Sequence, residues 1–265
     1  MKDLEKLNVQ LVRPNKFVPY VFVLPAVCGF GGWALATGAA PNIAYEDNAL
    51  AVFSIRLLIA SLILAPLPWL LKWDWRSQYF GSALLLFGSI ALMQLFPMAS
   101  IVVFSHLPRG LSWGLSLLES GLVIWWCARF VRVYRRIFAD PDLWKMIYVE
   151  ESDAIYYLQN VDKLVLEEKL RFNQTPTTMM FIVPMALAFL LVLFIGPVTR
   201  FVGVPFTHIF LAIGGIPIVL WALGATTRGF LIFYYFPWKL KRATGKNVYV
   251  DMASGLGKAV PNNSV

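Results

Sequence analysis

Six stretches of the chain are dominated by apolar residues, and short polar segments separate them. They cover residues 17–37, 48–71, 81–105, 111–128, 178–198 and 206–227. A helix of about 20 residues crosses the roughly 30 Å hydrocarbon core of a bilayer, because it rises about 1.5 Å per residue. The pattern therefore predicts an all-α, polytopic membrane protein with six transmembrane helices.

Two of the polar separators are short and contain helix breakers. Residues 105–110 include Pro108 and Gly110, and residues 200–205 include Gly203 and Pro205. Gly and Pro end helices and favour tight turns. We therefore expect spans three and four to form one helical hairpin, and spans five and six to form another.

The clusters of basic residues all fall on the same side of the membrane if the chain crosses it six times. They cluster before residue 17, in the 72–80 loop, after residue 128 and after residue 227, whereas the opposite side carries Arg109 and Arg200. Lys and Arg near span ends favour the cytoplasmic side. This predicts cytoplasmic termini. The short loops favour a bacterial inner membrane, with an organelle membrane as the alternative.

The basic start of the chain also raises the alternative of a cleaved signal peptide. The apolar stretch that follows runs to about Thr37, which is longer than the usual apolar region of such a peptide. We expect a retained first helix.

Composition supports a membrane protein and excludes several other classes. Hydrophobic residues make up 58% of the chain and charged residues 14%, and the net charge is +8. The basic residues flank the apolar stretches, so topology explains them better than nucleic-acid binding does. The pattern of the two cysteines, Cys28 and Cys127, and of the two histidines, His106 and His208, predicts no disulfide framework and no metal site. The common enzyme motifs are missing from the sequence, so we expect no enzymatic activity and no cofactor.

Residues 137–177 form the one long polar insertion, and they divide the chain into four parts. Residues 1–136 hold spans one to four, residues 178–238 hold spans five and six, and residues 239–265 form a cytoplasmic tail. Asp140 before Pro141 predicts a capped helix start, and apolar residues from 158 to 165 recur at helical spacing. We predict an amphipathic, helical cytoplasmic segment.

The insertion also holds eight of the fifteen acidic residues. One interpretation is a surface helix or helical hairpin that packs under the membrane domain. A second, compatible hypothesis is a docking surface for a cytosolic protein. The residues assigned to that surface are Glu150, Glu151, Asp153, Leu158, Val161, Glu167 and Glu168.

Three polar residues fall inside predicted spans at similar depth. Arg56 and Glu119 each lie eight residues from the outer end of a span, about 12 Å deep, and Gln94 lies about 16 Å deep. Intramembrane charges are costly and are usually paired or functional. We predict an Arg56–Glu119 pair with Gln94 nearby. It would be structural if it fixes the bundle, or functional if it binds a proton or a solute.

These features favour a non-enzymatic inner-membrane subunit of a larger complex, of the secretion, conjugation or envelope assembly type. The expected partners are the lipid bilayer, other membrane subunits and a cytosolic protein, with no nucleic acid. The alternative is a small-solute or ion transporter or channel that uses the polar site at Arg56, Gln94 and Glu119.

Overall fold

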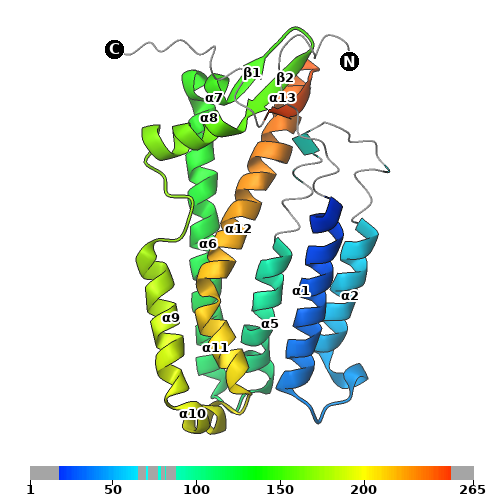
Figure 1. Ribbon diagram of the computed structural model, residues 1–265, viewed down its shortest axis with the longest axis vertical. Helices are drawn as coiled ribbons and strands as arrows, with labels where there is room; N and C mark the ends of the chain where they lie inside the picture. The colour runs from blue at the N-terminus through cyan, green and yellow to red at the C-terminus, as the bar shows by residue number, and fades with distance from the viewer. Residues whose placement is uncertain (1–17, 65–69, 71–76, 79–80, 82–87, 252–265) are drawn as a thin grey trace.

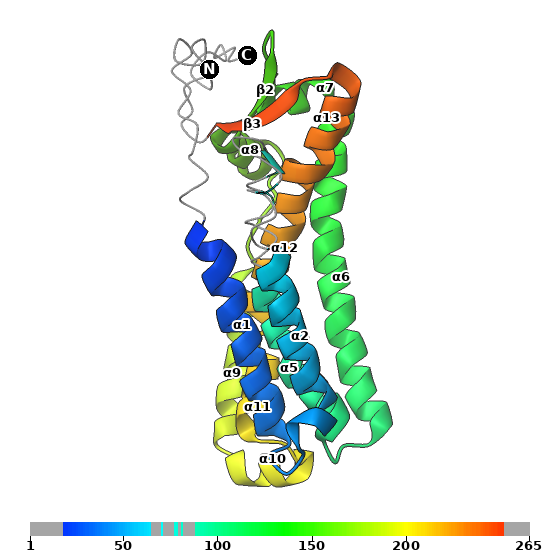
Figure 2. The same ribbon diagram turned by 90° about the vertical axis from the view of Figure 1, so that its right-hand side faces the viewer.

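A computed structural model describes residues 18–64 and 88–251 together with the isolated positions 70, 77, 78 and 81. It shows a helical bundle with a small mixed module at one end (Figures 1 and 2). The N-terminal basic segment, most of the 72–80 loop and residues 252–265 of the predicted tail lie outside the described residues. The bundle helices are α1 (Val18–Ala39), α2 (Ala49–Leu64), α5 (Gly88–Phe104), α6 (Arg109–Ala139), α9 (Thr178–Val192), α10 (Ile195–Val202), α11 (Phe206–Gly214) and α12 (Ile216–Phe230).

The prediction of a mostly helical chain is confirmed, and the described residues include candidate membrane spans, but the count of six spans is not confirmed. Among the described residues, two helices are long and apolar enough to cross a membrane: α6, with 31 residues, and the continuous stretch Ile216–Thr244, with 29 residues. A third candidate arises if α9 and α10 form one bent span. Val23–Ala39, Ala49–Ala60 and Gly88–Phe104 are shorter apolar helices.

Close helix contacts hold the first helices together. α1 packs against α2 and α5. A β-carbon placed on Gly29 would lie 2.7 Å from Leu58 of α2, and one on Gly32 would lie 2.6 Å from Phe96 of α5. Small residues let helix backbones approach closely in a membrane. The glycines of α1 therefore set its packing distance to both neighbours.

The predicted fifth span is not one straight helix. α9 ends at Val192, and α10 follows at an angle of 97°, crossing the end of the bundle (Figure 1). Pro197 lies in the first turn of α10 and has no N–H to bond the carbonyl of Leu193, so α9 cannot continue through this point. The predicted sixth span is also divided, because α11 ends at Gly214 and α12 begins at Ile216.

The polar insertion folds as a mixed α/β module, so the prediction of a purely helical segment is wrong, and the chain is mostly helical rather than all-α. Its elements are α7 (Pro141–Ile147), β1 (Tyr148–Glu150), β2 (Ala154–Leu158), α8 (Gln159–Leu164) and a π-helical turn at Val165–Lys169. The predicted cap at its start is confirmed, because the carboxylate of Asp140 accepts a hydrogen bond from the backbone N–H of Asp142 at 3.0 Å.

A segment of the predicted tail completes this module. After α12, a π-helical turn (Leu231–Tyr235) leads to α13 (Phe236–Thr244) and then to β3 (Asn247–Asp251). The sheet order is β1-β2-β3, with β1 antiparallel and β3 parallel to β2. Ile155 of β2 pairs with Val248 of β3. The domain boundary drawn at residue 238 therefore divides one folded unit.

One hydrophobic core joins this module to the bundle. It runs from Trp126 and Phe130 of α6 to the whole of β2, and from there to Phe233 and Phe236 beyond α12. β2 is buried along its full length. The module and the adjacent halves of α6 and α12 therefore share one close-packed core.

Candidate functional site

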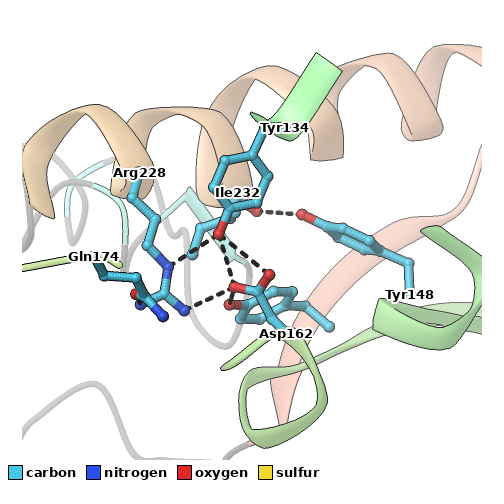
Figure 3. Close-up of polar contacts among 7 residues, drawn as sticks. Tyr134, Tyr148, Asp162, Gln174, Arg228 and Ile232 are labelled. Atoms are coloured by element: carbon cyan, nitrogen blue, oxygen red, sulfur yellow. Dashed lines mark hydrogen bonds and ion pairs between the residues drawn. The ribbon is translucent and has the colours of Figure 1, made fainter. Parts of the chain in front are cut away.

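The most connected polar group in the described chain is the carboxylate of Asp162 on α8. It is fully buried. The hydroxyl of Tyr134 donates to its two oxygens at 3.1 and 2.9 Å, and the hydroxyl of Tyr157 donates to Oδ2 at 2.7 Å. Nη2 of Arg228 completes the set with an ion pair of 2.7 Å (Figure 3). Asp162 thus joins α6, β2, α8 and α12.

Arg228 uses all three of its nitrogen atoms in this site. Nε donates to the hydroxyl of Tyr134 at 3.0 Å, and Nη1 donates to Oε1 of Gln174 at 2.6 Å. Its side chain is 21% exposed, while that of Asp162 is fully buried. A buried ion pair is sustained only when its remaining donors and acceptors are also bonded. Here each nitrogen of Arg228 and both oxygens of Asp162 have a bonded partner, so the charges are compatible with a buried position.

A third tyrosine, Tyr148, bonds the π-helical turn that follows α12 (Leu231–Tyr235). The backbone N–H of Phe236 donates to the carbonyl of Leu231, five residues earlier, as in a π-helix. The next bond of this kind would run from residue 237 to the carbonyl of Ile232, but Pro237 has no N–H to donate. The carbonyl of Ile232 accepts instead from the hydroxyl of Tyr148 at 2.7 Å (Figure 3). The π turn is therefore fixed to β1.

Burial determines the protonation of these phenols. Burial, and after it the carboxylate of Asp162, raises the pKa of Tyr148 and of Tyr157 well above the usual value for tyrosine. Both hydroxyls thus keep their protons at physiological pH and act as donors. The arrangement is suited to holding the module in place, because each of these phenols already has a bonded partner.

The residues assigned to the docking surface divide into two groups. The side chains of Glu150, Asp153, Glu167 and Glu168 are exposed, and that of Glu151 is partly so. Leu158 and Val161, by contrast, belong to the buried core, so their assignment to a docking surface is wrong. The physical reason is that the stretch before Val161 is a central strand covered on both faces rather than one side of a helix.

Two of these acidic residues also stabilise the module. Lys246, just before β3, donates from Nζ to Oε1 of Glu150 at 2.7 Å and to the carbonyl of Glu151 at 2.7 Å. The pair is exposed enough for its contribution to be small. The acids without such a contact, Asp153, Glu167 and Glu168, remain the candidates for a docking surface.

The predicted polar network inside the bundle is not formed. Arg56 is exposed on α2, and the described residues show no ion pair between it and Glu119. Glu119 is buried on α6, and its Oε1 has no hydrogen-bond partner. Gln94 is buried on α5 and donates from Nε2 to the carbonyl of Leu211. Equal depth did not ensure contact, because α2 packs against α1 whereas α6 packs against α5 and α12.

The two histidines have neighbours that leave little room for a metal ion. Nε2 of His208 lies 2.7 Å from the carbonyl of Leu35, so this nitrogen carries a proton and donates. A β-carbon on Gly203 would lie 2.6 Å from the ring of His106, so this ring is closely packed. No cluster of three metal-binding side chains occurs within the described ranges.

Comparison of the chain with known protein families, with curated proteins and with solved structures finds no match. The functional argument therefore rests on the geometry of the chain itself.

The Asp162–Arg228 network was not foreseen in the sequence. In the sequence, Arg228 belongs to the basic cluster after residue 227, and Asp162 is one of the eight acids of the polar insertion. One local signal was present: Asp162 lies between Val161 and Val165, within the apolar stripe. A charge at such a position needs a partner, but the sequence does not say that the partner lies 66 residues away.

Proposed function

We propose that the chain is a non-enzymatic subunit of a larger complex in a bacterial inner membrane, of the secretion, conjugation or envelope assembly type. The observation that carries the proposal is the buried Asp162–Arg228 network. It lies within the core that joins the module to α6 and α12, so a force or a binding event on the module would reach the membrane helices directly. A subunit that couples binding at its module to movement of its membrane helices needs such a connection.

We further propose six spans with both termini in the cytoplasm. Support comes from the connections at residues 40–48, 105–108 and 203–205, which lie at the end of the bundle away from the module (Figure 1). The clusters of Arg residues near the end of α6 and of Lys and Arg residues in α13 lie at the module end. Cytoplasmic loops carry an excess of Lys and Arg, which assigns the module to the cytoplasm in this proposal.

The docking surface in this proposal consists of Asp153, Glu167 and Glu168. These side chains are exposed. The partner would be a cytosolic protein with a basic surface, because charges of opposite sign steer association and select the partner.

The experiment is affinity purification of the full chain in mild detergent, followed by mass spectrometry. We expect a stable set of co-purifying proteins with the native chain and their loss from the variant with Glu167→Lys and Glu168→Lys. The matched control reverses Glu46 and Asp47, which are exposed at the opposite end of the bundle. Both variants should keep the native thermal unfolding midpoint, because the four side chains are exposed and no buried contact is lost.

Two results would contradict the proposal. One is a clean homo-oligomer without further proteins. The other is the same set of partners with both double variants. The alternative of a transporter that uses Arg56, Gln94 and Glu119 has less support, since Arg56 does not contribute to a shared site with Glu119.

A further inference from the structure

The helix that enters the bundle at Phe206 is interrupted half-way. α11 ends at Gly214, about 12 Å from its start, and α12 begins at Ile216. Pro217 has no N–H, so the carbonyl of Ile213 cannot accept the hydrogen bond that a continuous helix would give it. Interrupted helices inside membranes are found where the freed backbone groups line a cavity or bind a ligand.

Gln94 of α5 fills this interruption. Its Nε2 donates to the carbonyl of Leu211, which also accepts from the backbone N–H of Gly215 at 2.9 Å. A β-carbon on Gly215 would overlap the amide group of Gln94. Glycine at position 215 therefore allows a polar side chain to reach the broken backbone.

Glu119 of α6 lies at the same level. Val123, one turn further along α6, packs against the buried cluster that contains Ala91 of α5 and Val219 of α12. One turn closer to the outer end, α6 reaches Glu119. α12 runs parallel to α6, and the same step along it leads to Gly215. On α5, which runs antiparallel, the same step leads to the position next to Gln94. The buried carboxyl group of Glu119, with its unpartnered Oε1, thus lies at the depth of the interruption.

The surrounding helices offer no cation to this carboxyl group. Within the described residues, α5 and α9 contain no titratable or charged side chain. On α12 the nearest is Arg228, 13 residues from Gly215 and bonded to Asp162. On α11 it is His208, seven residues from Gly215 and bonded to α1. On α6 itself, Arg109 and Arg129 each lie ten residues away, about 15 Å along the helix.

We propose that Glu119 is a reversible proton-binding site coupled to the interruption between α11 and α12. An ionised carboxylate that is buried without a partner costs several kcal/mol, and a bound proton removes that cost. With its proton, Glu119 can donate to a backbone carbonyl left free at the interruption. Without it, the carboxylate needs a donor, and the amide of Gln94 lies at the same depth on α5, which, unlike the helix of Arg56, packs against α6. Loss of the proton therefore draws Gln94 away from the carbonyl of Leu211 and changes the geometry of the break.

This inference goes beyond the proposed role as a subunit, and it does not depend on the docking surface. A proton site at this depth would let the membrane helices respond to pH or to a proton gradient.

The test is modification of the purified full chain in nanodiscs by N,N′-dicyclohexylcarbodiimide, which adds to protonated carboxyl groups in apolar surroundings. Peptide mass spectrometry locates the adduct. A glutamate side chain in water is protonated at a level of about 0.2% at pH 7, since the reference pKa of this residue type is about 4.3. We therefore expect more than ~100-fold greater modification at Glu119 than at Glu167, a loss of this modification as pH rises to 9.5, and its absence from Glu119→Gln.

A second variant tests the coupling to Gln94. Gln94→Leu removes the donor available to the carboxylate, and a hydrogen bond to a charged group is among the strongest of its kind. The pH at which modification is half lost should rise by about one unit or more. An unchanged midpoint would overturn the coupling.

The remaining outcomes also decide the matter. Absence of modification at Glu119 between pH 5 and 9.5 would overturn the proposal. Modification that does not change with pH would mean a permanently neutral side chain and would overturn reversible binding. Protection by millimolar Na⁺ would mean that the ligand is a metal cation rather than a proton.

Discussion

Replacing Asp162 by alanine removes the shared acceptor of Tyr134, Tyr157 and Arg228 at once. The guanidinium of Arg228 would then keep a largely buried charge without its carboxylate. Removal of one partner from a buried ion pair costs about 3–5 kcal/mol. We expect the module to lose that amount of stability against local opening.

Hydrogen–deuterium exchange of the full chain in nanodiscs measures this loss directly. The amides of β2 are the reporter, because this central strand is bonded on both sides and buried along its length. A loss of 3 kcal/mol raises the population of the open state by about two orders of magnitude, since 1.36 kcal/mol corresponds to a factor of ten. Peptides from α1 and α2 should exchange at the native rate.

A double-mutant cycle separates the ion pair from general disruption. Asp162→Ala combined with Arg228→Met removes both charges, so its cost should be smaller than the sum of the two single changes by up to about 3 kcal/mol. Unchanged exchange in β2 of Asp162→Ala, or strictly additive costs in the cycle, would refute the role assigned to the network.

Three further outcomes are expected. Gly29→Leu should disturb α1 and lower the thermal unfolding midpoint, because its β-carbon would lie 2.7 Å from a leucine of α2, whereas Gly121→Leu should be tolerated because no atom lies within 4 Å of its β-carbon. In a chain whose native cysteines are replaced, a membrane-impermeant thiol reagent added outside the cells should label Asn42→Cys but not Asp153→Cys, although both side chains are exposed. Labelling at position 153 would disprove the cytoplasmic assignment of the module. The thermal unfolding midpoint should fall above about pH 10, because tyrosines ionise there in the unfolded chain while burial keeps Tyr157 protonated in the folded state. Tyr157→Phe should reduce this fall, and the same dependence of the midpoint on pH in both proteins would contradict the prediction.

Local features of the chain were determined by the sequence itself. The described parts of the apolar stretches became helices, the hairpin turn between α5 and α6 includes the predicted Pro108, and Asp140 caps α7 as expected. Each of these depends on residues within one or two turns of each other. Neighbouring side chains and backbone groups are enough to decide them.

Tertiary structure decided the features that depend on distant partners. Residues 154–158 are a short apolar run that suits a strand or a helix, and pairing with β3, about 90 residues later, made it a strand. The depths of Arg56 and Glu119 could be counted from the span ends, but their directions around the helix axes could not, and these directions separate them. The same limit hid the Asp162–Arg228 pair, because a sequence fixes how far along a helix a side chain lies, whereas only packing fixes what it faces.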